Sequence, residues 1–364
     1  MIKELYDYLI VGCGLSGATC ARLLAEKDKR VLIVEKRNHI GGNVYDYYNE
    51  FGILAHKYGP HIFHTRYKEV WDFLSRFTEW HLYQHRVLAY VQGKYVPLPI
   101  NLDTINLLYG TNYDALSIDG FFQRVRPRDL EVKNARDVVV AKVGKELYEM
   151  FFKGYTIKQW GLDPEELAPE VTARIPVRYN RDDRYFTDPY QGIPKLGYTQ
   201  MVAKILDHPR INLLLNCDCK EVIDEIKYRT MINTGSIDYH FDYKLGRLPY
   251  RSLQFEYEFH ETDYYQKVGT VNYPNDYDFT RITEFKHFTG QIIRGTTIVK
   301  EYPTSEGEPY YPIPRQSNRE LYQLYAGEGQ KFKNLFFTGR LGSYKYANMD
   351  IVVKDAMELV AKLA

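Results

Sequence analysis

Three glycines near the start of the chain have the spacing of a phosphate-binding loop. Gly12, Gly14 and Gly17 form the pattern G-x-G-x-x-G, and Glu35 follows the loop by roughly 20 residues. The first glycine permits a tight turn, the second lets the backbone approach a pyrophosphate, and the third allows a helix to pack closely on a strand. A carboxylate at this distance can accept hydrogen bonds from ribose hydroxyls. These residue types predict a dinucleotide site, with glycines that serve only as turns as the alternative.

Two strands and a helix must hold these residues in place. The apolar run 8–11 predicts a buried parallel strand, and residues 18–27 have apolar side chains at helical spacing. The run 30–34 predicts a second strand, which leads directly into Glu35. The pyrophosphate would then meet the free N–H groups and the partial positive charge at the N-terminus of the helix.

The stretch after this acid indicates which dinucleotide is bound. Lys36 and Arg37 are followed by Gly41-Gly42, which is typical of FAD proteins of the glutathione-reductase type, although two glycines alone also suit an ordinary loop. Residues 334–340 predict a buried strand that runs into Thr-Gly, and an amphipathic helix follows it. FAD domains of this type close with such a strand and helix. The sequence therefore predicts a discontinuous FAD-binding domain that is built from both ends of the chain.

Composition argues against several other classes of protein. The chain has 364 residues and a net charge of +1, so nucleic acid and anionic membrane are not expected as its main partners. No apolar run is long enough to span a bilayer, and we expect no signal peptide and no metal site. Cys217 and Cys219 are expected at alternating positions of a strand. A cytoplasmic location is the resulting expectation.

The middle of the chain predicts two further regions. Runs 82–91 and 95–98 predict a hairpin, and residues 101–169 have a helical pattern. The alternating, aromatic-rich runs 253–259, 268–273 and 292–301 predict an antiparallel sheet.

Aromatic residues of the helical region and arginines expected on loops supply the remaining chemistry. Aromatic rings can stack a base and arginines can clamp phosphate oxygens by bidentate hydrogen bonds, so the combination suits a nucleoside diphosphate. Core packing is the alternative for Phe151 and Phe152, and a surface salt bridge is the alternative for each arginine. The residues concerned are Phe151, Phe152, Tyr155, Trp160, Arg174, Arg281 and Arg340, with Arg251 and Asn272 at the ends of predicted strands.

Several longer segments match one known family. The motifs are Tyr58-Gly59-Pro60-His61-Ile62-Phe63-His64, Leu98-Pro99-Ile100-Asn101-Leu102, Gly154-Tyr155-Thr156-Ile157-Lys158-Gln159-Trp160, Arg174-Ile175-Pro176-Val177-Arg178, Phe241-Asp242-Tyr243, Tyr250-Arg251-Ser252-Leu253 and Gly339-Arg340-Leu341-Gly342-Ser343-Tyr344-Lys345-Tyr346. On these motifs the chain resembles the UDP-galactopyranose mutase family over nearly its whole length.

The resemblance implies an α/β fold with three domains. These are a discontinuous Rossmann-like FAD-binding domain of glutathione-reductase type, an inserted helical bundle and an antiparallel β-sheet domain for the substrate. The expected limits are 1–84, 195–237 and 316–364 for the FAD-binding domain, 101–170 for the helical bundle, and 85–100, 171–194 and 238–315 for the sheet domain.

The resemblance also implies an activity. Members of the family are isomerases that interconvert UDP-galactopyranose and UDP-galactofuranose, and galactofuranose serves surface and cell-wall polysaccharides. A UDP-sugar substrate, a homodimer and non-covalent FAD that is active in its reduced form are implied for this chain. The expected mechanism is a ring contraction through a sugar adduct on N5 of the reduced flavin, without net redox change.

Individual residues receive expected roles from the same resemblance. Catalysis is expected from Arg174, Arg281 and His61. Substrate contacts are expected from His85, Phe151, Phe152, Tyr155, Thr156, Trp160, Arg174, Tyr185, Asn272, Arg281, Tyr311 and Tyr346. Cofactor contacts are expected from Gly12, Gly14, Leu15, Ser16, Glu35, Lys36, Arg37, Gly42, Asn43, His61, Ile62, Arg340, Asn348, Met349, Asp350 and Ile351.

Three positions depart from the family pattern and leave alternatives open. Asn348 stands where Asp is usual, His85 where Asn is common, and Ser236 where Pro is usual. The first two are expected near the sugar and the flavin, so a related hexose such as that of UDP-N-acetylgalactosamine stays an alternative. A FAD oxidoreductase of the amine-oxidase type and a nucleotide-sugar-binding flavoprotein without activity are the alternatives from other classes.

Overall fold

Apolar runs from the start, the middle and the end of the chain form one parallel sheet. The computed structural model describes residues 5–173 and 176–363, and the strand order of this sheet is β10-β2-β1-β11-β17. In the register, Leu9 pairs with Met231 on one side and with Leu32 on the other. The strands are β1 (Leu5–Val11), β2 (Val31–Val34), β10 (Ile211–Leu214), β11 (Lys227–Asn233) and β17 (Leu335–Phe337). The predicted α/β fold class, with a Rossmann-like sheet drawn from both ends of the chain, is confirmed.

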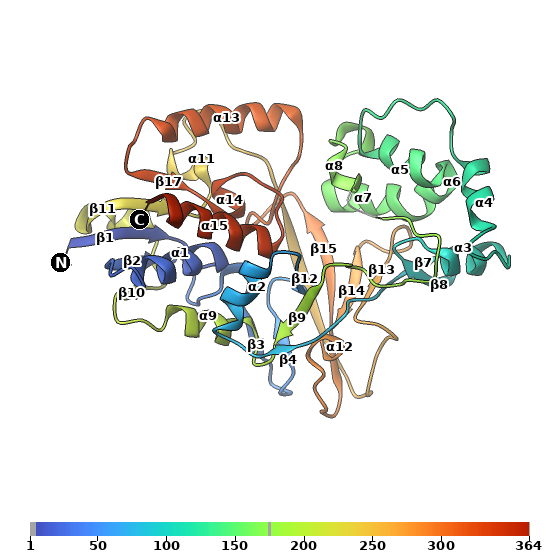
Figure 1. Ribbon diagram of the computed structural model, residues 1–364, viewed down its shortest axis with the longest axis horizontal. Helices are drawn as coiled ribbons and strands as arrows, with labels where there is room; N and C mark the ends of the chain where they lie inside the picture. The colour runs from blue at the N-terminus through green and yellow to red at the C-terminus, as the bar shows by residue number, and fades with distance from the viewer. Residues whose placement is uncertain (1–4, 174–175, 364) are drawn as a thin grey trace.

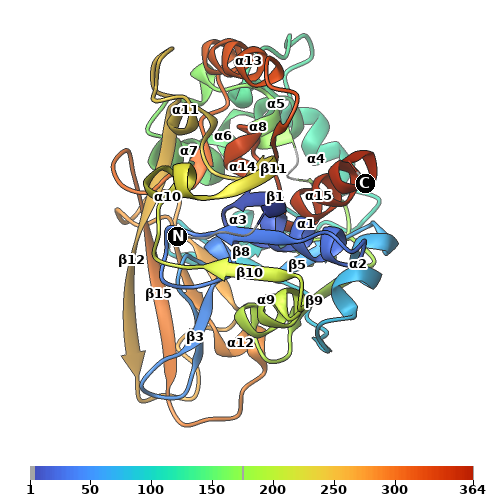
Figure 2. The ribbon, with the colours of Figure 1, turned by 90° about the vertical axis from the view of Figure 1, so that its left-hand side faces the viewer.

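Helices α1 and α15 lie side by side on this sheet (Figure 1 and Figure 2). Ala21 and Leu24 of α1 share one core cluster with Ala356 and Val360 of α15. Full burial of an aliphatic side chain stabilises the fold by about 1.5–3 kcal/mol, so this contact holds the C-terminal helix against the first one. The helices of this region are α1 (Leu15–Ala25), α2 (Lys68–Ser75), α9 (Tyr198–Leu206), α10 (Cys219–Val222), α11 (Ile237–His240), α13 (Gln316–Gln330), α14 (Gly339–Gly342) and α15 (Met349–Leu363).

A second sheet occupies the centre of the molecule, and its strand order is β16-β12-β15-β14-β13-β7-β8 (Figure 1). The sequence predicts an antiparallel sheet, but β7 and β13 pair in parallel, so the sheet is mixed. A long connection joins these two strands, and no hairpin sets their relative direction. The strands are β7 (Val87–Val91), β8 (Lys94–Leu98), β12 (Tyr250–His260), β13 (Thr270–Asn272), β14 (Arg281–Glu284), β15 (Thr296–Thr304) and β16 (Tyr311–Pro312), and α12 (Lys286–Thr289) follows β14.

The helical region lies beyond the central sheet, on the side away from the parallel sheet (Figure 1). Val139 and Val143 of α5 pack in one core cluster with Val87 and Val96 of the β7–β8 hairpin. The elements are α3 (Leu102–Tyr109), α4 (Ile118–Val125), α5 (Ala135–Val143), α6 (Lys145–Tyr148), a π-helix (Glu149–Lys153), α7 (Gly154–Trp160), a 3₁₀ turn (Pro164–Glu166) and α8 (Glu170–Ala173). Within the described part of the chain, no helix combines the length and the apolar character that a bilayer span requires.

Two small sheets connect the larger layers. Strands β3 (Asp46–Tyr48) and β4 (Leu54–His56) form one, and β5 (Phe63–Thr65), β9 (Tyr190–Pro194) and β6 (Trp80–His81) form the other. Strand β9 belongs by prediction to the sheet domain, yet it pairs with two strands that the prediction assigns to the FAD-binding domain. The three domain limits therefore stay a prediction.

Two local predictions are wrong. Cys217 lies in a loop and Cys219 begins α10, so they do not alternate along a strand. The run predicted to begin at Ile292 becomes a strand only at Thr296, after Gly295. Gly295 has a φ of +75°, and a Cβ there would lie 2.3 Å from the Phe259 ring, so the chain turns at this glycine before it can pair.

Removal of a buried helix cap should destabilise the fold. The Asp46 carboxylate accepts hydrogen bonds from the backbone N–H groups of Tyr198 (2.6 Å) and Thr199 (2.8 Å), which begin α9. We expect Asp46→Ala to lower the free energy of unfolding by about 2 kcal/mol, because two buried donors lose their acceptor. Urea denaturation measures this, with exposed Asp129→Ala as the control. Equal stability of the two variants would contradict the prediction.

Candidate functional site

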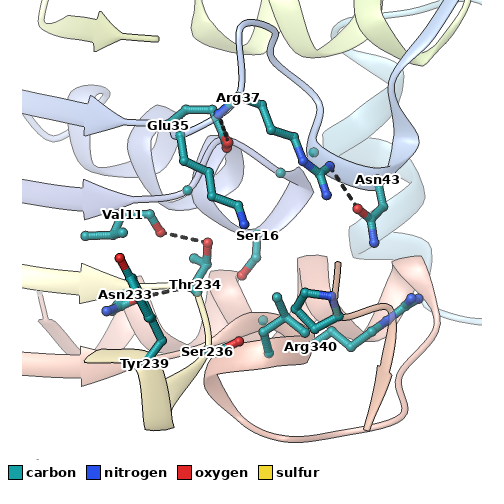
Figure 3. A pocket seen from close by; sticks show the side chains of 18 of the residues that line it. Val11, Ser16, Glu35, Arg37, Asn43, Asn233, Thr234, Ser236, Tyr239 and Arg340 are labelled. Carbon is teal, nitrogen blue, oxygen red and sulfur yellow. Dashed lines mark hydrogen bonds between the residues drawn. The ribbon is translucent and has the colours of Figure 1, made fainter. Parts of the chain in front are cut away.

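A cavity of about 730 Å³ opens where β1, β2 and β11 end. Val11, Val34 and Asn233 are the last residues of these strands, and all three line it. Parallel α/β sheets bind ligands at this edge, because the carboxyl ends of their strands and the N-termini of their helices meet there. Figure 3 shows Glu35 and Arg37 on one side of the cavity and Ser236, Tyr239 and Arg340 on the other.

Each of the three glycines of the loop occupies its position for a different physical reason. Gly12 has a φ of +97°, and a Cβ there would lie 2.2 Å from Thr234 Oγ1. A Cβ at Gly17 would lie 2.0 Å from the carbonyl oxygen of Gly12, so this glycine lets α1 pack against the strand. At Gly14 the nearest atom is 3.9 Å away, on Gly42. The fold itself therefore requires the first and third glycines, whereas the second leaves space in front of the backbone.

Side chains around this space suit a dinucleotide. The Glu35 carboxylate accepts hydrogen bonds from the backbone N–H groups of Cys13 (2.7 Å) and Arg37 (2.9 Å), which fix its orientation at the cavity. Arg37 donates to Asn43 Oδ1 at 2.9 Å (Figure 3). The hydroxyl of Ser16 is buried, lines the cavity and has no hydrogen-bond partner within the described residues. A phosphate oxygen at the N-terminus of α1 would satisfy this donor.

The structure gathers most of the predicted cofactor residues at this cavity. Those that line it are Gly12, Gly14, Leu15, Ser16, Glu35, Lys36, Arg37, Gly42, Asn43, His61, Arg340 and Met349. The others do not line it: Ile62 packs in a core cluster, Asn348 is exposed, and Asp350 accepts from the backbone N–H of Ile351 at 2.8 Å.

Sequence reasoning missed the segment at α10, which contributes Asp218, Cys219, Lys220 and Ile223, and two further segments of the cavity wall. One follows β11 and comprises Asn233, Thr234, Gly235, Ser236, Tyr239, His240, Asp242 and Tyr243. The run Met231-Ile232-Asn233, which leads into Thr234-Gly235, could have served as a signal for it, since carboxyl ends of parallel strands share one edge. The other segment is Glu308-Pro309, and Lys36 Nζ donates to both carboxylate oxygens of Glu308, at 2.8 and 3.0 Å. No sequence pattern connects these two distant positions.

A row of polar side chains runs across three neighbouring strands of the central sheet, β13, β14 and β15. Asn272 pairs with Arg281, and Arg281 pairs with Glu301, on the neighbouring strands β13, β14 and β15. Side chains at paired positions lie on the same face of a sheet. Arg281 Nε is 3.4 Å from Glu301 Oε1, and neither of these buried atoms nor Asn272 Oδ1 has a hydrogen-bond partner within the described residues. Unpartnered buried polar atoms are costly and rare, so this row calls for a ligand.

An aromatic cluster lies beside this row. The ring of Trp160 meets those of Tyr311 and Tyr346 edge to face, at 6.4 and 5.5 Å between centroids, and the two tyrosine rings are 5.5 Å apart. The guanidinium of Arg340 lies 5.4 Å from the centroid of the Tyr311 ring. Because Arg340 also lines the dinucleotide cavity, it connects the two places.

The ionisable groups of the polar row and of the aromatic cluster influence one another. Burial works against the charge of Arg281, but Glu301 together with neighbouring tyrosines more than compensates and raises the pKa of the guanidinium. Burial raises the pKa of Tyr155, with Arg281 and Glu301 close enough to influence it. Burial, with Tyr346 as the next cause, raises the pKa of Tyr311 to about 12. The phenol groups are therefore neutral hydrogen-bond donors at neutral pH.

The remaining predicted substrate residues are distributed around the row. Phe151 and Phe152 pack in the core of the helical region, and Thr156 is buried in α7. The Tyr185 ring meets the His85 ring edge to face at 5.6 Å. Arg174 lies outside the described residues.

Two arginine predictions need correction. Arg281 is the first residue of β14 rather than a loop residue, because it pairs with Glu301. Arg251 lies near the start of β12, and its guanidinium is already bonded within the protein. It donates to the carbonyl oxygens of Gln159 (3.0 Å) and Lys158 (3.2 Å). Arg251 therefore anchors the end of α7 and does not face a ligand.

Two buried histidines and the half-buried His61 are held neutral. Burial lowers the pKa of His56, His61 and His85 to about 3, with added repulsion from His56 and Arg340 at His61 and from Arg281 and His64 at His85. His61 Nδ1 donates to the Gly59 carbonyl at 2.8 Å, so its Nε2 carries the lone pair. A neutral imidazole with a free lone pair thus lies at the wall of the cavity.

Comparisons with known proteins identify the family. A model of UDP-galactopyranose mutase matches residues 150–346, and a model of the NAD(P)-binding Rossmann-like domain matches residues 10–77. A "Probable UDP-galactopyranose mutase" of Klebsiella pneumoniae is 41% identical over 97% of this chain and 93% of its own. The chain belongs to the UDP-galactopyranose mutase family.

Relatives within the family differ in substrate. The dTDP-fucopyranose mutase of Escherichia coli is 38% identical over 96% of each chain. The crystal structure of reduced UDP-galactopyranose mutase superposes with a TM-score of 0.78 and 16% identity, and it covers 99% of this chain and 96% of its own. Members of the UDP-galactopyranose mutase family are nucleotide-sugar mutases, so this chain is an isomerase of that kind with a flavoprotein fold.

The neutral histidines give a test by pH titration. Because the folded-state pKa values lie near 3 and the ordinary value is 6.5, the unfolded chain binds protons more readily between these pH values. The free energy of unfolding should therefore fall as pH drops from 6.5 toward 3. Ring NMR signals assigned by His→Gln variants should stay those of neutral imidazole at pH 5 for His56, His61 and His85. The same signals in urea are the reference, and a protonated His85 at pH 5 would contradict the assignment.

Proposed function

We propose that the chain interconverts UDP-galactopyranose and UDP-galactofuranose, with FAD as its cofactor. The observation that carries this proposal is the row Asn272, Arg281 and Glu301, in which the Arg281–Glu301 ion pair leaves three buried polar atoms without a hydrogen-bond partner in the described residues. The row lies beside an aromatic cluster and is linked through Arg340 to the dinucleotide cavity. Such a site offers stacking rings, a guanidinium and a cavity for a cofactor within one region. Family membership supports the same activity, and a cytoplasmic homodimer is part of the proposal on that ground alone.

The residues of the cavity would hold FAD as follows. The backbone at Gly14 and the hydroxyl of Ser16 would meet the pyrophosphate, and Glu35 would accept from ribose hydroxyls. His61 and Arg340 would lie toward the isoalloxazine. When bound and reduced, the flavin supplies a nucleophilic nitrogen for the anomeric carbon of the sugar.

The protein's own residues would bind the nucleotide and stabilise its departure. Rupture of the bond between the anomeric carbon and UDP places negative charge on the diphosphate, and Arg281 would offset that charge, together with Arg174 from the sequence-based prediction. Tyr155, Tyr185, Tyr311 and Tyr346 would donate hydrogen bonds from their hydroxyl groups, and Trp160 would stack on the base. Glu301 would orient the Arg281 guanidinium.

Product analysis tests the proposal. The dithionite-reduced protein is incubated with UDP-galactopyranose, UDP-N-acetylgalactosamine and, because of the Escherichia coli relative, dTDP-fucopyranose. A furanose isomer of UDP-galactose, formed faster than the isomers of the other two, is the expected result. Preference for dTDP-fucopyranose would assign the activity of a dTDP-fucopyranose mutase instead. An oxidised sugar would overturn the proposal that the chain is a mutase. Full activity with strictly oxidised flavin would contradict the need for reduction.

Occupation of the space at Gly14 should remove the flavin but leave the fold intact. A Cβ there would have its nearest protein atom, Gly42 Cα, at 3.9 Å, and the φ of −75° suits any residue. Gly14→Val should therefore melt near the wild-type temperature, yet purify with little flavin, because the valine fills the space proposed for the pyrophosphate. The ratio of flavin to protein absorbance measures this. Gly327→Val, with open space around it, is the control and should stay yellow.

Replacement of Arg281 by lysine should slow turnover more than it affects folding. Lysine keeps a positive charge opposite Glu301 but loses the planar fork of donors. We expect Arg281→Lys to lower kcat on the order of 10²–10³-fold, the usual cost of a lost electrostatic donor in a transition state. Arg294→Lys, whose side chain is 89% exposed, is the matched control. A wild-type rate for Arg281→Lys would contradict the proposed role.

A further inference from the structure

Helix α7 carries Tyr155 and Trp160, whereas Asn272 and Arg281 belong to the strand pair β13–β14 of the central sheet. The proposed substrate site therefore depends on how two elements from different layers are held relative to each other. Residues 273–280 connect Asn272 to Arg281, and Tyr273 N–H donates to the Thr280 carbonyl at 2.9 Å across this connection. Whatever binds this loop to α7 determines the distance between the base-binding and diphosphate-binding groups.

The ammonium of Lys158 makes this connection. Its Nζ donates to the carbonyl oxygens of Tyr273 (2.5 Å), Tyr277 (2.7 Å) and Phe279 (3.1 Å). An ammonium has three donors, so none is left for a ligand. Lys158 and Tyr155 are three residues apart and so share one face of the helix. The loop is thus bound to the same helical face that presents Tyr155.

Three further contacts hold the same helix at its ends. Asn275 of the loop donates to the Met150 carbonyl at 2.9 Å, just before α7. A Cβ at Gly154 would lie 2.6 Å from the Pro274 carbonyl oxygen, so loop and helix are in direct backbone contact. At the other end, Arg251 of β12 donates to the carbonyls of Lys158 and Gln159. Each of these bonds ends on a backbone carbonyl and therefore fixes the main chain rather than a side chain.

We infer that Lys158 is a positioning residue that sets the register between the base subsite on α7 and the diphosphate subsite on β13–β14. This inference rests on the proposed function, because it assumes a nucleoside diphosphate that spans both places. A ligand that engages both subsites benefits from their fixed separation, whereas a ligand that depends mainly on the base subsite does not.

The chain offers a matched control. Lys286 is buried where Lys158 is half-buried, and its Nζ likewise donates to three carbonyls, those of Asp263 (2.9 Å), Ile293 (2.7 Å) and Gly295 (2.9 Å). Lys286→Met therefore removes the same number of bonds to backbone carbonyls as Lys158→Met. It touches neither α7 nor the loop 273–280 through these bonds.

The experiment compares the affinities of UDP and UMP by calorimetry on the flavin-loaded protein. Lys158→Met should weaken UDP on the order of tenfold and UMP by less than about threefold, since only UDP reaches the diphosphate subsite fully. Lys158→Arg should recover much of the loss. Lys286→Met should lower the melting temperature comparably but leave the ratio of the two affinities unchanged.

An unchanged ratio in Lys158→Met, or an equal change in Lys286→Met, would overturn the inference. If Lys158→Met fails to fold, Asn275→Ala carries the same test, because it removes the loop-to-helix bond at Met150. If the wild type prefers dTDP, then dTDP and dTMP replace the two probes. A wild type that binds no nucleotide and isomerises no sugar nucleotide would refute the proposed function itself, which is a different result from an unchanged ratio.

Discussion

The ion pair between Arg281 and Glu301 is the interaction on which the proposed site depends. Glu301 is 1% exposed, and a carboxylate in such surroundings needs an opposite charge. The register of β14 and β15 places the two residues opposite each other, and Asn272 extends the row on β13. The central sheet is therefore the support of the polar site as well as a layer of the fold. A shift of one residue in this register would direct the row to the opposite face.

The two larger sheets meet functionally at Arg340. Arg340 follows β17 of the parallel sheet in the chain and lines the dinucleotide cavity. Its guanidinium lies over the Tyr311 ring. Its guanidinium is fixed by the carbonyls of Tyr310 (3.4 Å) and Ala347 (3.0 Å). A sugar held near Arg281 would consequently lie close to a flavin held at the glycine loop. Proximity of this kind converts a bimolecular encounter into a reaction within one site.

Membership in the family settles the class of chemistry but not the sugar. Relatives with 41% and 38% identity carry names for UDP-galactopyranose and dTDP-fucopyranose chemistry. Both need a leaving nucleoside diphosphate, so the guanidinium and the phenols described here suit either. The two substrates differ in the base, in the ribose 2′-hydroxyl and in the hexose, so selectivity between them requires contacts to at least one of these parts. His85 is a natural candidate, since its ring is buried next to Tyr185 and its charge environment includes Arg281.

Local patterns in the sequence determined the glycine loop, the acid after β2 and the helical region, because each depends on neighbours within a few residues. They also indicated Asn272 as the end of a strand. Tertiary structure alone decided that Glu301 faces Arg281, that β7 and β13 run in parallel, that Glu308 reaches Lys36, and that Arg251 and Lys158 anchor α7. In each case the partners are far apart along the chain. Strand register and the packing of layers bring such residues together, and no local periodicity encodes a distance across the fold.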